Sequence, residues 1–165
     1  MGSITIQKID ITALQVDAIV NAANEGLWAG GGVCGAIFRA AGMRELQDAC
    51  GKIGGCKTGS AVITPGFALP ASFVIHAVGP IWNGGSFGER DQLYGAYASS
   101  LALAVENGCK SIAFPLISSG IYGYPVPEAW EVAISACKDF LASNDISIVF
   151  AVLTDDMKAL GESFL

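Results

Sequence analysis

Hydrophobic residues are concentrated in short runs that are separated by longer amphipathic stretches. The first run alternates apolar with polar positions, whereas the later ones are nearly continuous and rich in Val, Ile and Phe. Continuous runs of this kind are typical of strands covered on both faces of a sheet. We therefore predict strands at residues 4–9, 18–20, 61–64, 73–78, 112–117 and 146–153.

The stretches between these runs have the periodicity of amphipathic helices. Residues 92–107 place their apolar side chains on one side, and Asn107-Gly108 is a suitable helix end. Residues 127–141 repeat apolar positions at helical spacing, and Pro127 suits a first helical turn. Three shorter helices are predicted at residues 35–41, 44–52 and 155–164.

This alternation of strands and helices predicts an α/β fold. We expect a three-layer α/β/α sandwich with a mixed, largely parallel sheet, formed by one domain that spans residues 1–165. In such sheets, ligands bind beyond the carboxyl ends of the strands. Functional residues are therefore expected directly after Val20, Ile117 and Leu153.

Composition narrows the classes of ligand. The net charge of −6 argues against a nucleic-acid polymer, which needs a basic face. With no apolar run of membrane-spanning length and no visible signal peptide, we expect a cytoplasmic protein without a membrane partner. Five cysteines without a C-x-x-C pair and a single histidine predict reduced thiols, no metal and no cofactor. Nothing in the sequence demands more than a monomer.

A glycine-rich segment follows the predicted strand at residues 18–20. Residues 30–35 place three consecutive glycines at the start of a helix, where a backbone can approach a phosphate closely. They also read G-x-G-x-x-G, as in nicotinamide-dependent oxidoreductases. However, nine residues separate this strand from the glycines, and no acidic residue ends a second strand about 20 positions later, as that fold requires. The oxidoreductase class is therefore rejected.

A second loop of small residues, at positions 118–123, follows the predicted strand at residues 112–117. It offers backbone N–H donors and two serine hydroxyls. One such loop alone is most often an ordinary turn. Two of them after strands, in a chain too acidic to bind phosphate by charge, predict a diphosphate site.

Several segments together share the pattern of one family. They are residues 10–12, 16–24, the glycine-rich segment, and residues 39–42, 74–80 and 113–125. These motifs resemble the macrodomain family, and most closely its MacroD-type branch, which includes bacterial O-acetyl-ADP-ribose deacetylases and mono-ADP-ribosyl hydrolases. The resemblance implies ADP-ribose or an ADP-ribosylated protein as partner. It also implies hydrolysis of a mono-ADP-ribosyl or O-acetyl-ADP-ribose ester at the distal ribose.

The resemblance assigns ligand contacts to particular residues. Asp10 is expected to accept a hydrogen bond from the adenine amino group, beside the Ile11 backbone, although a helix-capping role fits Asp10 equally well. Asn24 is expected at the distal ribose, with Tyr122 packed against that sugar. The diphosphate residues are Gly31, Gly32 and Val33 on one side and Ser118, Ser119, Gly120, Ile121 and Tyr122 on the other.

Two further polar residues, Asn21 and His76, are expected to have structural roles. Near the end of the last predicted strand, Leu153 and Thr154 stand where some macrodomains stack an aromatic residue on adenine. Because an aromatic stack contributes more than an aliphatic contact, this departure predicts a modest affinity.

The chain also departs from the family pattern in the glycine-loop helix. Family hydrolases commonly read G-G-G-V-D-G-A-I-H, whereas Cys34 and Phe38 replace the aspartate and the histidine here. A thiol is a weak acceptor at neutral pH, and general-base help contributes roughly a hundred- to ten-thousand-fold in rate. The candidate catalytic residues are Asn24, Cys34 and Tyr122, with catalysis resting on a positioned water. For Cys34, packing as a small residue is favoured over a nucleophilic role. The alternative function is an ADP-ribose reader with little or no catalysis.

Overall fold

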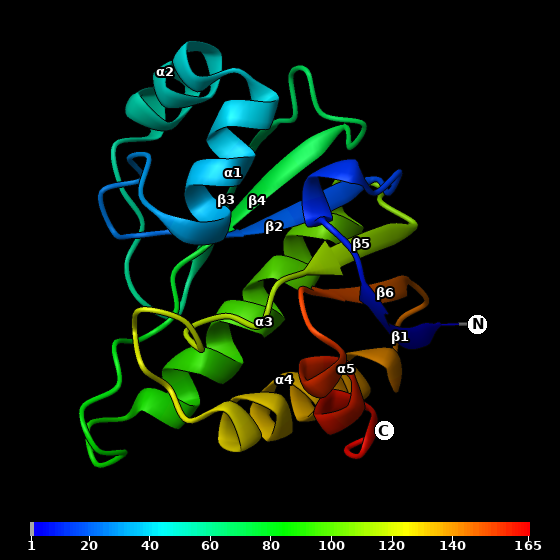
Figure 1. The fold of residues 1–165 in the computed structure, drawn as a ribbon. Helices are drawn as coiled ribbons and strands as arrows, with labels where there is room; N and C mark the ends of the chain where they lie inside the picture. Colours follow the sequence, from blue (N-terminus) through cyan, green and yellow to red (C-terminus); the bar gives the residue numbers. More distant parts are fainter. Residues whose placement is uncertain (1) are drawn as a thin grey trace.

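Six strands form one sheet through the centre of the molecule (Figure 1). The computed structural model describes residues 2–165. The strands are β1 Ser3–Lys8, β2 Ala18–Ala22, β3 Ala61–Pro65, β4 Phe73–Ala77, β5 Ser111–Phe114 and β6 Ser147–Val152. Their order is β1-β6-β5-β2-β4-β3, and only β3 and β4 pair antiparallel. The prediction of a mixed, largely parallel sheet is confirmed.

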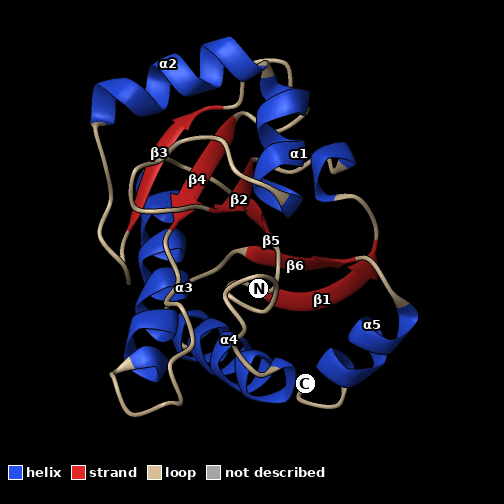
Figure 2. Ribbon diagram, turned by 60° about the vertical axis from the view of Figure 1, so that its left-hand side comes forward, coloured by secondary structure: helices blue, strands red, loops and turns tan. Residues whose placement is uncertain are grey.

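Helices cover both faces of this sheet (Figure 2). They are α1 Gly32–Ala41, α2 Met43–Ile53, α3 Glu89–Glu106, α4 Val126–Leu141 and α5 Asp155–Glu162, with a 3-10 turn, η1, at Ile11–Ala13. Helices α1 and α2 pack on one face, and α3, α4 and α5 pack on the other. The predicted three-layer α/β/α sandwich is therefore confirmed.

Each face of the sheet has its own hydrophobic cluster. Under α3, α4 and α5, the ring of Phe150 lies 5.6 Å from that of Phe114 and 5.2 Å from that of Trp130. Under α1 and α2, the cluster is built around Phe38 and Leu46, which are both fully buried. Burial of one such side chain stabilises the fold by about 1.5–3 kcal/mol. The sheet is therefore packed against helices on both faces, and this packing fixes the position of the loops at its carboxyl edge.

Two boundaries near that edge differ from the prediction. Strand β5 ends at Phe114, three residues early. Pro115 follows and has no N–H to give to a neighbouring strand, and the N–H of Ile117 donates to the Tyr97 hydroxyl at 2.9 Å. Helix α1 begins at Gly32, three residues earlier than predicted. The first difference lengthens the loop after β5, and the second lengthens α1 at its N-terminus. Both segments carry residues of the site.

Three findings bear on the classes of site. All five cysteines lie in the described chain as free thiols. Within residues 2–165, no three His, Cys, Asp or Glu side chains gather in a way that could hold a metal ion. None of the helices in this part of the chain combines the length and apolar character needed to cross a bilayer.

Candidate functional site

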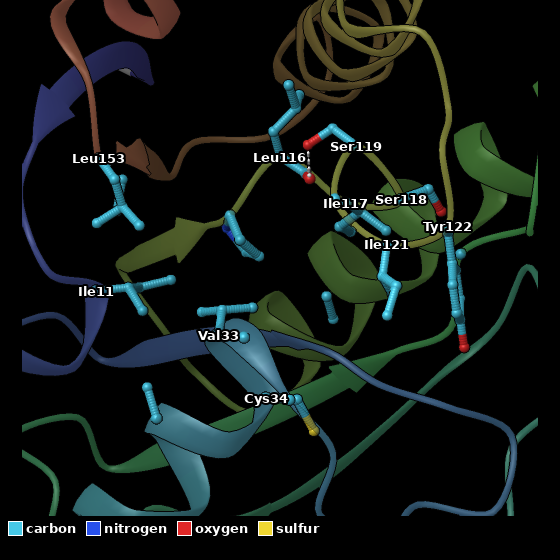
Figure 3. Close-up of a pocket in the computed structure, with 18 of the residues that line it drawn as sticks. Ile11, Val33, Cys34, Leu116, Ile117, Ser118, Ser119, Ile121, Tyr122 and Leu153 are labelled. Atoms are coloured by element: carbon cyan, nitrogen blue, oxygen red, sulfur yellow. Dashed lines mark hydrogen bonds between the residues drawn. The ribbon is translucent and has the colours of Figure 1, made fainter.

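A cavity of about 680 Å³ lies at the carboxyl edge of the sheet. Its wall comes from segments that follow β1, β2, β4, β5 and β6 and from the first turn of α1. Figure 3 shows the side chains of these segments pointing toward one another across the space. The expectation that functional residues follow Val20, Ile117 and Leu153 is met by this cavity.

The cavity brings together every residue that the sequence assigned to a ligand. Asp10, Ile11, Asn24, Gly31, Gly32, Val33, Ser118, Ser119, Gly120, Ile121 and Tyr122 all line it, and so does Cys34. Three of their segments lie between Asp10 and Cys34, and the fourth, at residues 118–122, is far from them along the chain. Their individual roles in binding and catalysis are predictions that this common location supports.

The first wall of the cavity is the N-terminal turn of α1. Gly31 caps this helix and Gly32 has a φ of 58°, a conformation that glycine adopts at little cost. The first N–H groups of a helix have no acceptor within it, so the amides of Gly32, Val33 and Cys34 are donors at the cavity wall. A β-carbon at Gly31 or Gly32 would meet no atom within 4 Å. The backbone here is thus open to a ligand, and the helix dipole favours an anion.

The second wall is the loop of residues 115–124. Ser118 has a φ of 66°, a left-handed conformation that costs a non-glycine residue about 1–3 kcal/mol. The loop closes on itself through the N–H of Tyr124, which donates to the Ser118 carbonyl at 2.9 Å. Within the described chain, no protein acceptor is found for the N–H groups of Gly120, Ile121 or Tyr122. A strained turn with three free amides is well suited to an anion.

The serine hydroxyls of this loop differ from the expectation that both would serve as donors to a ligand. The Ser119 hydroxyl donates to the Leu116 carbonyl at 2.8 Å, as drawn in Figure 3. The Ser118 hydroxyl is buried with no protein partner in the described chain, and it lies against Gly79, where any β-carbon would collide with it. The second wall therefore offers backbone donors more than hydroxyl donors.

The charge of the cavity wall is unusual for an anion site. Among the described residues that line it, the only charged side chain is Asp10, and none is Lys or Arg. A pyrophosphate between the two walls would be held by backbone amides and by the α1 dipole. This is the arrangement that the acidic composition led us to expect.

Asp10 has the capping role, and its contact with adenine stays a prediction. Its Oδ1 accepts hydrogen bonds from the N–H of Thr12 at 2.9 Å and from the Thr12 hydroxyl at 2.8 Å, so Asp10 caps η1. This capping uses one oxygen, and Oδ2 remains available at the cavity. Ile11 and Leu153 lie at the same end (Figure 3), and Leu153 is 78 % exposed. This end of the cavity can therefore hold a flat, apolar group with an amino substituent.

The opposite end of the cavity contains Asn24, Cys34 and Tyr122. Asn24 is committed to the neighbouring backbone: its Nδ2 donates to the Trp28 carbonyl at 2.9 Å, and its Oδ1 accepts from the Trp28 N–H at 3.1 Å. One Nδ2 hydrogen and one Oδ1 lone pair are left for a ligand or a water. Burial raises the pKa of the Tyr122 hydroxyl, with smaller contributions from Cys34 and Glu25.

Cys34 faces both the core and the cavity. It is 5 % exposed and packs in the cluster with Ile37 and Phe38, as a small filling residue would. Its Sγ lies 3.9 Å from the Trp28 carbonyl oxygen, to which the S–H can donate. Asn24, Cys34 and Tyr122 carry no carboxylate, so this end of the cavity offers no carboxylate base among the described residues that line it.

Asn21 and His76 form a buried polar cluster outside the cavity wall. Their side chains are hydrogen-bonded at 3.0 Å through Asn21 Nδ2 and His76 Nδ1, and His76 Nε2 lies 3.0 Å from the Thr64 hydroxyl. Burial lowers the pKa of His76 to about 4, so the ring is neutral. Both residues are fully buried, which confirms the prediction of structural roles.

Sequence reasoning missed two contributors to this site. Gly79 lines the cavity beside Ser118, and the Gly79-Pro80 pair after a strand was a signal that could have revealed it. Trp28 supplies the backbone that holds Asn24, and no pattern in the sequence marks that role.

Comparison with known proteins agrees with this geometry. Residues 20–133 match the Macro domain family. A Macro domain-containing protein of Chlorobaculum tepidum is 58% identical over 83% of this chain and 79% of its own length. An O-acetyl-ADP-ribose deacetylase of Citrobacter koseri is 48% identical over 98% of this chain and 94% of its own. The Oceanobacillus iheyensis macrodomain with ADP superposes with a TM-score of 0.92 at 38% identity, covering 96% of this chain and 87% of that one. The chain therefore belongs to the macro domain family.

Proposed function

We propose that this protein binds ADP-ribose and hydrolyses esters at the distal ribose, either of O-acetyl-ADP-ribose or of a mono-ADP-ribosylated protein. The observation that carries the proposal is the pair of walls at α1 and residues 115–124, which present free backbone amides to one cavity without any cation. A relative named O-acetyl-ADP-ribose deacetylase and a macrodomain structure with ADP support it. So does a Trypanosoma brucei macrodomain in complex with ADP-ribose, with a TM-score of 0.90 and 39% identity over 97% of this chain and 68% of that one.

The proposed pose follows from the chemistry of the two ends of the cavity. Adenine lies at the Asp10 end, where Oδ2 accepts from the amino group and Leu153 covers the ring. The pyrophosphate lies between the two walls. The distal ribose then reaches Asn24 and Tyr122, with Cys34 beneath it.

The proposed reaction uses positioning in place of a protein base. A water held by the free valences of Asn24 attacks the ester carbonyl, and a phosphate oxygen of the substrate accepts its proton. The bond between the carbonyl carbon and the ribose oxygen breaks, the phosphate passes the proton to that ribose oxygen, and the products are the carboxylic acid and a free ribose hydroxyl. Well-oriented neighbours can contribute a large part of a barrier. The missing carboxylate at Cys34 predicts a slower enzyme than relatives that carry one, because a general base contributes roughly a hundred- to ten-thousand-fold.

We further propose that residues 1–165 act as one domain and as a monomer in the cytoplasm. The single domain is supported by the cavity, whose lining comes from residues between Ile9 and Met157.

The second candidate function is a reader that binds ADP-ribose and releases it unchanged. Cys34, which stands where family hydrolases carry an aspartate and packs in the core, is the observation that favours it.

Two measurements test the proposed function. Calorimetry with ADP-ribose, ADP and NAD measures binding. We expect ADP-ribose to bind most tightly, because ADP lacks the distal ribose and the nicotinamide of NAD would need additional room beyond the Asn24 end of the cavity. Release of acetate from O-acetyl-ADP-ribose, or of ADP-ribose from an ester-linked modified protein, measures turnover. Failure to bind ADP-ribose at millimolar concentration would refute the proposal as a whole. Binding with turnover no faster than buffer would leave the reader function.

A further inference from the structure

Glu89, at the start of α3, has a buried carboxylate outside the cavity. It is 1 % exposed. Its Oε2 accepts hydrogen bonds from the N–H groups of Asn83 and Gly85, both at 2.9 Å, and its Oε1 accepts from the N–H of Phe87 at 2.6 Å. Burial alone would raise the pKa of this carboxyl, but backbone amides that donate to it, including its own, lower the pKa to about 2. Glu89 is therefore ionised at any pH at which the protein works.

The negative charge of Glu89 is stabilised by backbone N–H donors, because the neighbouring cation, Arg90, forms its ion pair with another residue. The Arg90 guanidinium pairs with Glu131 at 2.6 and 3.0 Å on the surface. An anion that accepts three amide hydrogen bonds acts as the centre around which a loop folds. The carboxylate of Glu89 is the centre of the loop at residues 81–88.

Glu89 accepts three of the hydrogen bonds that order the loop at residues 81–88. The loop has no helix or strand of its own, and its three glycines have a positive φ. Two of its large apolar side chains, Ile81 and Phe87, are exposed at 58 % and 72 %. Apart from the contacts of Trp82 and a hydrogen bond from Asn83 Nδ2 to the Ile81 carbonyl at 3.2 Å, the shape of the loop depends on the hydrogen bonds to Glu89.

This loop is joined directly to the second wall of the cavity. The N–H of Trp82 donates to the Tyr122 carbonyl at 2.8 Å. The Trp82 ring packs on the ring of Tyr124, with their centroids 4.7 Å apart. Tyr122 lines the cavity and its own N–H is free. A shift of Trp82 would thus move the Tyr122 carbonyl, and with it the neighbouring N–H of Tyr122.

Helix α3 holds the other end of the same wall. The hydroxyl of Tyr97, which is fully buried on α3, accepts the N–H of Ile117 at 2.9 Å. The wall at residues 115–124 is therefore fixed to α3 at its start through Tyr97 and at Tyr122 through Trp82 and Glu89. Neither Tyr97 nor Glu89 lines the cavity.

From these contacts we infer that Glu89 is a positioning residue for ligand binding. Its carboxylate orders the loop at residues 81–88, and through Trp82 that loop sets the position of Tyr122 and of the free amides of the second wall. This inference rests on the proposed binding of ADP-ribose for its functional consequence. Its structural part, the dependence of the second wall on Glu89, can be measured without any ligand.

The test is Glu89→Gln with Glu131→Gln as the matched control. Glutamine has nearly the same shape, but its NH₂ group cannot accept and would face at least one of the three N–H donors. Glu131 pairs with Arg90, the residue that follows Glu89, but its carboxylate is on the surface. Its substitution should therefore change neither the loop at residues 81–88 nor the second wall. Glu89→Asp keeps the charge with a shorter side chain, and we expect an effect between those of wild type and Glu89→Gln.

The first readout is amide hydrogen exchange in the unliganded protein. Glu89→Gln should accelerate exchange at Phe87, Trp82 and Tyr124, whose N–H groups are hydrogen-bonded, while leaving the hydrogen-bonded N–H of Gly35 in the first wall unchanged. The second readout is the dissociation constant of ADP-ribose. It should rise by about tenfold, which corresponds to the loss of one hydrogen bond between the second wall and the ligand. Both are measured below the melting temperatures of all variants, and Glu89→Asp substitutes if Glu89→Gln does not fold.

The outcomes separate this inference from the proposed function. Faster exchange at Tyr124 with weaker ADP-ribose binding supports the inference. Faster exchange confined to residues 83–88, with Tyr124 and the dissociation constant unchanged, would overturn it, because Glu89 would then order only its own loop. Equal acceleration in both walls would also overturn it, since that result indicates general destabilisation. If the wild type itself does not bind ADP-ribose, the proposed function fails, and exchange at Tyr124 still decides whether Glu89 positions the wall.

Discussion

Asn24 holds the backbone of Trp28 with both ends of its side-chain amide, donating at 2.9 Å and accepting at 3.1 Å. The residue assigned to the distal ribose is therefore also the brace of its own loop. A substitution at Asn24 changes two things at once, the shape of the loop and the groups offered to a water or ligand. Stability and turnover must be measured together to separate them.

Asn24→Ala should destabilise the protein and abolish most turnover. Loss of two hydrogen bonds in a partly exposed loop predicts a decrease in the free energy of unfolding of about 1–2 kcal/mol, measured by urea denaturation. Turnover should fall further than binding, because the proposed water loses its holder. If the catalytic rate constant is unchanged in folded Asn24→Ala, Asn24 has no catalytic role.

Cys34→Asp should raise turnover. It places a carboxylate where family hydrolases carry one, and general-base help is worth roughly a hundredfold or more in rate. The charge also has to be placed at a site that is 5 % exposed, so we expect a lower melting temperature. Steady-state hydrolysis of O-acetyl-ADP-ribose measures the gain.

Cys34→Ala is the control for a nucleophilic thiol at the same position. If Cys34 acts as a small packing residue, this variant should retain the turnover of the wild type. Loss of all turnover in Cys34→Ala, with binding retained, would instead assign a chemical role to the thiol.

Gly32→Val should prevent tight binding of ADP-ribose. The φ of 58° at Gly32 strains a β-branched residue, and its side chain would project into the cavity opening. The strain of about 1–3 kcal/mol is present in the free and the bound protein alike, so it lowers stability. The side chain in the opening blocks the ligand and should raise the dissociation constant by at least about tenfold. Gly51→Ala, in the middle of α2 with no atom near its added carbon, should bind normally. Calorimetry on both variants measures the difference.

Binding of ADP-ribose should depend little on salt. No Lys or Arg lines the cavity among the described residues, and a net charge of −6 repels an anionic ligand. Screening weakens that repulsion, so affinity should stay constant or rise slightly as NaCl increases from about 50 to 500 mM, which shortens the Debye length roughly threefold. An affinity that falls severalfold over this range would mean that a cation contacts the pyrophosphate.

His76 should make stability fall between pH 6.5 and pH 4. Its pKa is lowered from 6.5 to about 4 by burial, so the unfolded state binds the proton first as pH decreases. Stability from this group is complete above pH 6.5 and is lost progressively as pH falls toward 4, by about 3 kcal/mol in total at 1.4 kcal/mol per pKa unit. His76→Gln should remove this part of the pH dependence. Urea denaturation of both proteins at several pH values measures the difference, and parallel curves would contradict the assignment.

The elements around the core could be predicted from the sequence because their hydrophobic pattern is strong. Strand β6 and helix α4 were located to within one residue at each end. The start of α3 was placed at Gln92, three residues late, because Glu89 reads as a polar loop residue. Its burial depends on three amides from the preceding loop, which is a tertiary feature that periodicity does not reveal.

The site was predictable to the level of its segments, and less so to the level of its contacts. The glycines of α1 and the loop after β5 carry local signals, and the fold brings them to one cavity as expected. The hydrogen bonds of Asn24, Ser119 and Asp10 to nearby backbone or hydroxyl groups were not foreseen in full, because each depends on loop geometry. Strands β1 and β3 lie at the sheet edges and are more exposed than a fully covered strand, which composition alone did not indicate for β3.

The two walls of the cavity belong to different hydrophobic clusters. Cys34 at the start of α1 packs in the cluster on one face of the sheet, whereas Leu116 and Ile117 of the second wall pack in the cluster on the other. The hydrogen-bonded sheet lies between these two clusters. Its strands set the width of the gap that a pyrophosphate has to fill, and the contacts that lead from Glu89 act on only one side of that gap.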